Sequence, residues 1–336
     1  MNNTNRRSAS RPPATARRPA NPVNEAGVTS RARAALRQAA AAAGFNPEGA
    51  RTLQYHRNWV VRLPHAAPGC PVVAKIHEPR STLTAVRREV EVAAWLHRSG
   101  VRTARPVVER PTETEAGLLV SFTDDLGDGG PASSEDLGRL LANLHKLPLP
   151  SRIVLPDLDV TGNLLSRISR LPESVLAPAD RHRLSTHVSA AGEQWQNTPC
   201  GNDVVLHGDL NTLNSVTSST GPALIDFENV AKGPAAYDLA FQAWRRDGFG
   251  ENPAEYASFC RAYGTDVTID RQGAPYKVLA RLRAAAGTLI ALEAAVHDPV
   301  WRPEAERRLN CVRTQNTNPA RHPWNWNTHP AKPKGT

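Results

Sequence analysis

Cysteine is scarce in this chain of 336 residues, which holds four of them. None belongs to a CxxC pair, and no histidine stands at zinc-ligand spacing from any of them. The sequence therefore predicts neither a disulfide framework nor a structural zinc site. Scattered free thiols are typical of a reducing compartment, so we expect a cytoplasmic protein. The four are Cys70, Cys200, Cys260 and Cys311.

Long hydrophobic runs are also missing. No uninterrupted apolar stretch approaches the roughly 18 residues of a membrane-spanning helix. Near the start of the chain, no apolar segment follows the arginines, as a secretory signal peptide would require. Apolar residues make up 40% and charged residues 22% of the chain, which is typical of a globular protein. We therefore expect no membrane partner.

Positive charge is in excess, but it is confined to the two ends. The formal net charge is +9, of which residues 1–37 carry +7 and residues 300–336 carry +5, so that residues 38–299 carry −3. One interpretation is a protein that acts on nucleic acid or a membrane surface through these ends. The chain has no recognised reader motif and no interleaving of aromatic and basic residues in its body. We therefore expect no specific nucleic-acid partner.

Composition and periodicity divide the chain into four parts. Residues 1–29 are rich in proline, arginine, asparagine and serine without periodicity, and we expect them to be disordered. Residues 30–122 combine strand and helix patterns, and residues 123–315 are mostly helical. Residues 316–336 return to proline, asparagine and threonine, and are expected to form a flexible tail. The predicted fold class is α+β.

The individual elements follow from periodicity and capping. In the first half we expect helices at 30–43 and 84–99 and strands at 51–63, 71–77 and 117–122. In the second half, Ser133 precedes two acidic residues and an apolar helical pattern, which is typical of an N-cap. Further helices are expected at about 178–196, 235–245, 253–262 and 275–297. Trp324 and Trp326 fall in the expected tail, with docking onto the body or a second subunit as the alternative.

The clearest chemistry lies on one predicted hairpin. Two short strand patterns flank the turn-forming run SSTGP, which predicts an antiparallel hairpin centred on Thr220. In that register Asn214 faces Asp226 at the open end of the hairpin. Asp209 stands five residues before Asn214, on the loop that enters the hairpin. Three oxygen-bearing side chains are therefore expected to converge on one small volume.

Such a cluster suits Mg²⁺, which prefers a few oxygen ligands together with water and phosphate oxygens. One carboxylate then remains to position and deprotonate an attacking hydroxyl. This division of labour is typical of phosphoryl transfer. A single loop aspartate is more often a cap or turn residue. The joint spacing HxDxxxxN, followed by a hairpin and an apolar run ending in aspartate, indicates a phosphotransferase.

These motifs resemble the aminoglycoside phosphotransferase family, small-molecule kinases related to protein kinases. The run HGDLNTLN at 207–214 is similar to the catalytic loop of that family, and DFE at 226–228 to its metal-binding triplet. The segment from GP at 233–234 to DLA at 238–240 is similar to the family's GP…DLA segment. The resemblance implies a bilobal protein-kinase-like fold. Its smaller N-terminal lobe has an antiparallel sheet and one key helix, and its larger C-terminal lobe is mostly helical.

The resemblance also implies roles for individual residues. Asp209 corresponds to the catalytic base, and Asn214 and Asp226 to the ligands of Mg²⁺. His207 corresponds to a residue that braces the loop rather than taking part in the chemistry. The implied cofactors are Mg²⁺ and ATP, with GTP as an alternative nucleotide, and the partner is a small molecule that offers a hydroxyl.

The first half of the chain contains a matching nucleotide-binding pattern. Lys75 lies in VVAKI, which resembles the kinase strand that carries the phosphate-binding lysine. A lysine inside an apolar strand needs a partner, and Glu89 is expected to pair with it. Glu91 is the rival partner, but it lies about 200° around the helix from Glu89. Ser121 and Phe122 belong to the strand that is expected to lead into the adenine-binding hinge.

The loop that should cover the nucleotide departs from the family pattern. The run QYHRN at 54–58 contains no glycine, the residue that lets backbone amides approach phosphates closely. Arg57 and Asn58 are therefore expected to contact the phosphates with their side chains. The same feature leaves open a kinase-like pseudoenzyme, a binding module that holds nucleotide without turnover.

The acceptor is not specified by these motifs. An antibiotic and a metabolite such as choline, homoserine or a sugar are both compatible with them. The acceptor is expected to rest on the helices after Asp238, where several polar and aromatic residues are available, although each is more often structural than a contact. These candidates are Trp244, Asp247, Glu293, Asp298 and Trp301.

Overall fold

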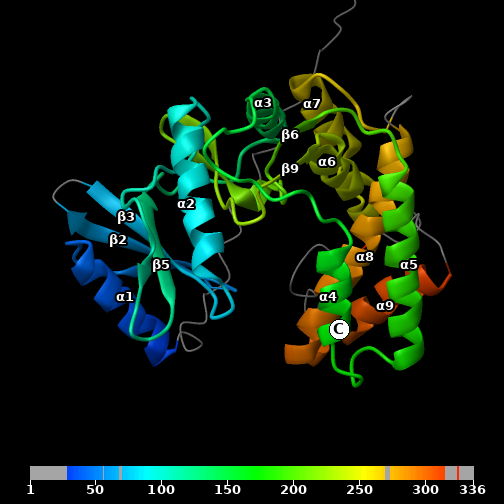
Figure 1. Ribbon diagram of the computed structural model, residues 1–336, viewed down its shortest axis with the longest axis horizontal. Coiled ribbons are helices and arrows are strands. Elements are labelled where there is room, and N and C mark those ends of the chain that lie inside the picture. Colours follow the sequence, from blue (N-terminus) through cyan, green and yellow to red (C-terminus); the bar gives the residue numbers. More distant parts are fainter. Residues whose placement is uncertain (1–28, 56, 68–69, 269–272, 315–323, 325–336) are drawn as a thin grey trace, which may run out of the picture. The chain divides into compact units, whose positions relative to one another are not determined.

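The computed structural model describes residues 29–55, 57–67, 70–268, 273–314 and residue 324 (Figure 1). The described chain forms two compact units. The first holds the residues up to Leu83 together with Arg110–Asp125, and the second holds Thr84–Glu109 and the residues from Leu126 onward. Among the described residues, no helix is both long and apolar enough to cross a membrane.

The first unit is built on an antiparallel sheet of five strands in the order β1-β2-β3-β5-β4. The strands are β1 (Arg51–Tyr55), β2 (Trp59–Ala67), β3 (Cys70–Ile76), β4 (Thr112–Glu113) and β5 (Leu119–Asp124). Burial alternates along β3, where Val72, Ala74 and Ile76 are buried. This period of two is expected for a strand with one face against a core.

One helix of the first unit, α1 (Ser30–Ala42), packs on this sheet (Figure 1). Its N-cap is Thr29, whose hydroxyl accepts a hydrogen bond from the backbone N–H of Ala32 at 3.1 Å. Its buried residues recur at the spacing of one helical face and are Ala32, Ala35, Leu36, Ala39 and Ala40. The predicted helix at 30–43 is therefore confirmed. The single strand predicted at 51–63 is wrong, because the chain turns back on itself between β1 and β2.

The second unit is mostly helical. Its helices are α2 (Leu83–Arg98, which begins at the border with the first unit), α3 (Ser134–His145), α4 (Gly162–Arg170), α5 (Pro178–Gln196), α6 (Ala236–Phe249), α7 (Pro253–Tyr263), α8 (Gly273–His297) and α9 (Arg302–Arg313). Two short antiparallel pairs complete it: β6 (Asp203–Leu206) with β9 (Ala231–Pro234), and β7 (Ser215–Ser218) with β8 (Gly221–Leu224). The 3-10 turns η2 (Thr212–Asn214) and η4 (Pro299–Trp301) precede β7 and α9.

Capping and apolar periodicity account for most of these helices. The hydroxyl of Ser133 accepts a hydrogen bond from the backbone N–H of Asp136 at 3.1 Å, and so caps α3 as predicted. The helices predicted at 178–196, 253–262 and 275–297 are confirmed to within two residues at each end. Helices α4 and α9 were not predicted. Helix α9 is rich in charged residues, and its buried positions are only Ala305, Arg308, Leu309 and Val312.

Two apolar clusters hold the second unit together. The first joins α4, α5, α8 and α9, with Leu184, Val188, Leu279 and Leu289 fully buried in it. The second joins α2, α3, α6 and α7 to the segment that carries the motif, and it includes Leu210, Leu224, Phe227 and Leu239. Leu210 and Leu224 lie between the predicted catalytic residues in the sequence and belong to this core, which helps to fix the position of the loop.

Candidate functional site

Asp209 and Asn214 lie on one short loop that follows β6. The amide Nδ2 of Asn214 donates to the backbone oxygen of Asp209 at 2.8 Å and to its carboxylate Oδ2 at 3.1 Å. The side-chain oxygen of Asn211 accepts from the backbone N–H groups of Leu213 and Asn214, at 2.8 and 3.2 Å, and so caps η2. The structure therefore brings Asp209 and Asn214 into direct contact, as the sequence predicts.

The hairpin that follows has a different register from the predicted one. Ser215 pairs with Leu224 and Ser218 with Gly221, so the turn has two residues. The register centred on Thr220 is therefore wrong by one residue. Two-residue turns are the commonest in hairpins because their twist matches that of the strands. Gly221, with φ of 115°, supplies a backbone conformation that other residues rarely adopt.

As a consequence of this register, Asn214 faces Ile225 and not Asp226. The backbone N–H of Ile225 donates to the backbone oxygen of Asn214 at 3.0 Å. Asp226, the next residue, has φ of 66°, and among the described residues it is the only non-glycine residue with a positive φ. This left-handed conformation interrupts the alternation of side chains at the end of the strand. Conformations of this kind are often found at functional sites.

His207 and Phe227 connect the catalytic loop to the segment around Asp226. The imidazole of His207 is fully buried, with Nε2 3.1 Å from the backbone oxygen of Ile225. Its ring lies 5.2 Å from the ring of Phe227, which is itself buried. The structure thus places His207 where it can brace the loop.

Asp238 fixes the catalytic loop from the other side, a contact that sequence reasoning did not identify. Its buried carboxylate accepts from the backbone N–H groups of His207 at 2.7 Å and Gly208 at 3.0 Å. It also lies 3.2 Å from Nε2 of His145, whose Nδ1 is 2.9 Å from the hydroxyl of Tyr263. The sequence pointed to Asp238 only as the aspartate of the DLA segment, without indicating what it contacts.

The hydrogen bonds of Asp238 also decide its protonation. Burial alone raises the pKa of the Asp238 carboxyl, but the hydrogen bond and charge of His145, with the charge and backbone N–H of His207, outweigh it and lower the pKa. Asp238 therefore stays ionised and keeps accepting from the loop.

The surroundings of Asp209 raise the pKa of its carboxyl. Burial is the largest influence, and the nearby negative charge of Asp226 acts in the same direction. The charges of Arg283 and His207 and the hydrogen bond from Asn214 act in the opposite direction. A carboxylate with a raised pKa is a better proton acceptor than an ordinary one.

The donor set at this position fits Mg²⁺. Because the Nδ2 group of Asn214 is directed at Asp209, its oxygen Oδ1 points away from that residue. An amide oxygen and the carboxylate of Asp226 are hard oxygen ligands, and Mg²⁺ is usually held by one or two such groups with water and phosphate oxygens. Among the described residues, no group of three histidine, cysteine, aspartate or glutamate side chains is placed to hold a metal ion.

Lys75 and Glu89 lie in different compact units. Lys75 is half-buried on β3, where its backbone pairs with Val60 of β2 and Ser121 of β5. Glu89 is half-buried on α2, whereas Glu91 is exposed. The pairing of Lys75 with Glu89 stays a prediction.

Arg57 and Asn58 have partners within the first unit. Nη2 of Arg57 pairs with the carboxylate of Glu78 at 2.8 Å, and the side-chain oxygen of Asn58 accepts from the backbone N–H of Glu78 at 3.0 Å. These contacts tie the turn after β1 to the end of β3. Phosphate binding by the two side chains stays a prediction.

Ser121 and Phe122 are buried in the sheet of the first unit. The hydroxyl of Ser121 lies 2.9 Å from Nε2 of His77, and the ring of Phe122 packs edge-on against Phe45 with centroids 5.1 Å apart. Burial and the charge of Lys75 lower the pKa of His77 to about 3, so its imidazole is neutral. Both side chains have structural contacts here, and their predicted contact with the adenine stays a prediction.

The acceptor-side candidates all have structural partners. Asp247 pairs with Arg246 at 2.5 Å, Glu293 accepts two hydrogen bonds from Arg167 at 2.8 Å each, and Asp298 caps η4. Trp244 and Trp301 are buried in apolar clusters. Each of these residues therefore has a structural contact within the second unit, and contact with the acceptor stays a prediction.

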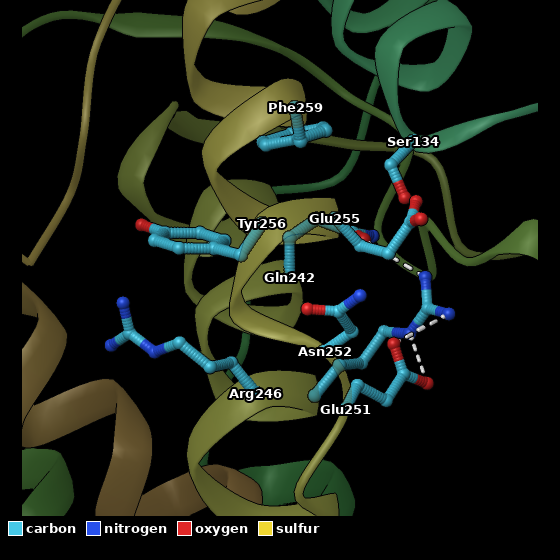
Figure 2. Close-up of a pocket in the computed structure, with 9 residues that line it drawn as sticks. Ser134, Gln242, Arg246, Glu251, Asn252, Glu255, Tyr256 and Phe259 are labelled. Atoms are coloured by element: carbon cyan, nitrogen blue, oxygen red, sulfur yellow. Dashed lines mark hydrogen bonds and ion pairs between the residues drawn. The ribbon is translucent and has the colours of Figure 1, made fainter. Parts of the chain in front are cut away.

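A surface pocket lies between the start of α3, the end of α6 and α7 (Figure 2). Figure 2 shows Glu251 paired with an arginine that also lines the pocket, and this pair is Arg245 Nη2 to Glu251 at 2.9 Å. None of the predicted site residues lines the pocket, so it is a separate feature. Its lining residues are Ser134, Gln242, Arg245, Arg246, Glu251, Asn252, Glu255, Tyr256 and Phe259.

Solved structures with a similar fold are small-molecule kinases. The amicoumacin kinase hAmiN, in complex with AMP-PNP, Ca²⁺ and Ami, is 14% identical with a TM-score of 0.64 over 82% of this chain and 91% of that chain. The choline kinase LicA from Streptococcus pneumoniae is 15% identical with a TM-score of 0.57 over 79% and 93%. The spectinomycin phosphotransferase APH(9)-Ia, in complex with ADP and its antibiotic, is 13% identical with a TM-score of 0.54 over 80% and 90%.

A search of the curated proteins gives no match. The family comparison matches residues 45–284 to the phosphotransferase enzyme family, abbreviated APH. This span contains the catalytic loop, the DFE triplet and the DLA segment, and it covers most of the described chain. The chain therefore belongs to the phosphotransferase enzyme family and is a small-molecule kinase with the kinase-like α+β fold that the sequence predicts.

Proposed function

We propose that this enzyme transfers the γ-phosphoryl group of a Mg²⁺-nucleotide to a hydroxyl of a small molecule, with Asp209 as the catalytic base. The observation that carries the proposal is the contact of Asp209 with Asn214 on a loop held by buried residues. ATP is the expected nucleotide, with GTP as the alternative. The acceptor is an antibiotic or a metabolite such as choline, homoserine or a sugar.

Asp209 would orient the acceptor hydroxyl and take its proton. The hydrogen bond from Nδ2 of Asn214 fixes the carboxylate Oδ2, which leaves Oδ1 to accept from the hydroxyl. The raised pKa of Asp209 supports this role, because a more basic carboxylate accepts a proton more readily. Positioning of this kind supplies much of the catalysis in phosphoryl transfer.

Asn214 and Asp226 would hold Mg²⁺ through Oδ1 and the carboxylate. When bound, the ion neutralises charge on the phosphate oxygens. Asp238 and His207 would keep the loop in place from two sides. We further propose that Lys75, oriented by Glu89, binds the phosphates, with Arg57 and Asn58 on the turn before β2 and with Ser121 and Phe122 on the strand that leads to the adenine.

The test is phosphoryl transfer by purified protein with Mg-ATP and, separately, Mg-GTP, against a panel of hydroxylated antibiotics, amino alcohols, hydroxy acids and sugars. The readout is the mass of one added phosphate on the acceptor. Asp209→Asn keeps the shape of the side chain and is expected to lower transfer by roughly 10²–10⁴-fold, the usual contribution of a general base.

Asp203→Asn is the matched control, because Asp203 is exposed on the preceding strand and lies outside the loop. It should transfer at the wild-type rate. Transfer retained by Asp209→Asn would remove Asp209 from the role of base. A wild-type protein that binds nucleotide but transfers phosphate neither to an acceptor nor to water would support the pseudoenzyme instead.

A further inference from the structure

Arg283, on α8, is held against two aromatic side chains of α6. Its guanidinium carbon lies 4.4 Å from the ring centroid of Tyr237 and 4.9 Å from that of Phe241. Nη2 donates to the backbone oxygen of Tyr237 at 3.2 Å, and the buried Nε has no hydrogen-bond partner among the described residues. The side chain is half-buried. Its position is therefore set by stacking, while much of its hydrogen-bonding capacity is unused.

Helix α6 places this arginine beside the catalytic loop. Asp238 binds the backbone of the loop just before Asp209, and the amide Nε2 of Gln242 donates to the backbone oxygen of Leu210, just after it, at 2.8 Å. These two residues lie one helical turn apart on one stripe of α6. Tyr237 and Phe241 precede them by one residue each, so they form the adjacent stripe, about 100° around the helix. The stripe of α6 that contacts Arg283 is thus next to the stripe of α6 that bonds to the loop around Asp209.

The charge of Arg283 acts on the reaction site, although no carboxylate of the described residues forms a direct ion pair with it. No carboxylate of the described chain lies within 4.0 Å of its guanidinium. Among the charges that influence Asp209, that of Arg283 is the largest, and it lowers the pKa of the carboxyl against the effect of burial. A half-buried guanidinium that forms no direct ion pair can bind an anionic group without breaking one, so this position favours an anionic ligand.

We propose that Arg283 binds an anionic group, a carboxylate, of the acceptor whose hydroxyl is held by Asp209. This inference rests on the proposed function and narrows its acceptor to hydroxy acids. The planar guanidinium can donate two parallel hydrogen bonds to a carboxylate, and stacking on Tyr237 and Phe241 orients it for that purpose.

The same geometry disfavours a cationic acceptor at this position. Aromatic rings such as those of Tyr237 and Phe241 attract ammonium groups, but here Arg283 already lies over one face of each ring. An ammonium group of the acceptor would have to lie beside a guanidinium and would be repelled.

Two series of matched ligands test the proposal. Gluconate, gluconamide and glucamine share one polyol chain and end in a carboxylate, an amide and an ammonium group, and glycerate, glyceramide and aminopropanediol form a shorter series. Their affinities are measured by calorimetry on protein with bound Mg-AMP-PNP. In at least one series the acid is expected to bind roughly 10-fold or more tightly than its amide, and the amine least tightly, because a charge-assisted hydrogen bond is the strongest kind.

Arg283→Met should reduce the affinity for the acid to that for the amide. Arg283→Lys keeps the charge but lacks the planar guanidinium, so its affinity for the acid should lie between those of the wild type and Arg283→Met. Arg281→Met removes an equal charge two residues away, where the side chain bonds to Gln194, and should keep the ranking. Acids that bind no better than their amides in both series, or an unchanged preference in Arg283→Met, would overturn the proposal.

Binding of Mg-AMP-PNP to the wild-type protein distinguishes failure of the proposed function from failure of the anion site. If the wild-type protein does not bind Mg-AMP-PNP, the proposed function is wrong, and the ligand series are then measured on the free protein. Preference for the acids there, lost in Arg283→Met, still supports an anion site at Arg283, whereas no preference contradicts it.

Discussion

At the scale of single residues, the catalytic loop depends on backbone conformations that few residue types adopt. Gly208 has φ of 83°, and a Cβ placed on it would lie 2.0 Å from the backbone oxygen of Asn229. Any residue with a Cβ would meet this obstacle. Asp226 adopts a positive φ as a non-glycine residue, a conformation that costs free energy and is often found at functional sites.

Replacing this glycine tests how tightly the loop is packed. Gly208→Ala should lower the free energy of unfolding more than Gly201→Ala, by roughly 1–3 kcal/mol, because the added methyl group must displace backbone. Gly201 is the matched control, since its φ of 81° is similar but nothing lies within 4 Å of its Cβ position. Urea denaturation measures both. Equal losses would show that the contact with Asn229 is relieved at no cost.

At the scale of elements, the sequence predicts which segments form helices better than it predicts how strands pair. Ser133 and the leucines after it specify α3 through local capping and periodicity. The register of the hairpin depends on the number of residues in its turn. The run SSTGP is compatible with a turn centred on Thr220 and with the two-residue turn that the structure has, so the predicted register was wrong by one residue. The positive φ of Asp226 also changes the course of the chain after the hairpin, which no pattern in the sequence reveals.

Contacts between elements that lie far apart in the sequence could not be predicted either. Asp238 was recognised as part of a motif, but its hydrogen bonds to His207 and Gly208 depend on the placement of α6 against the loop. Arg283 lies 74 positions after Asp209 in the numbering, and only the packing of α8 on α6 brings it near. Asp209, Asn214 and Asp226 could be predicted as site residues from the sequence because one local motif contains all three.

The buried histidine of the small sheet makes the stability of the first unit sensitive to acid. The pKa of His77 is about 3 in the folded protein and 6.5 when exposed, so between these values the unfolded state binds more protons. Stability should therefore fall as the pH decreases from 6.5 toward 3, with a slope of up to about 1.4 kcal/mol per pH unit from this residue.

His77→Gln should remove this part of the slope, and urea midpoints between pH 6.5 and 4 measure it. His97→Gln is the control, because His97 is exposed at the end of α2 and should keep the wild-type dependence. A slope unchanged in His77→Gln would mean that another group accounts for the acid sensitivity.

At the scale of the whole chain, a residue far along the sequence completes the second unit. Trp324 is buried, its ring packs edge-on against Trp244 and Phe249, and its backbone N–H donates to the oxygen of Gly248 at 3.0 Å. The guanidinium of Arg308 lies 5.1 Å from its ring centroid. For this residue the docking alternative is confirmed, whereas Trp326 lies outside the described residues.

Trp324→Ala should lower the free energy of unfolding by about 3–5 kcal/mol, the usual cost of removing a large buried aromatic side chain. Trp324→Phe keeps one ring and should lower it less. Thermal or urea denaturation checks both, and a change below about 0.5 kcal/mol in Trp324→Ala would show that its packing contributes little.

The proposed function requires that Asp209, Asn214 and Asp226 form one site, with Asp209 as the base and the other two as ligands of Mg²⁺. Its most direct test is calorimetric measurement of ATP affinity with and without Mg²⁺, in wild-type protein, Asp209→Asn and Asp226→Asn. We predict that Mg²⁺ strengthens ATP binding in the wild type and in Asp209→Asn, and that Asp226→Asn loses that gain by about 10-fold or more because a charged oxygen ligand is removed. Mg²⁺-dependent binding that persists unchanged in Asp226→Asn would contradict the site.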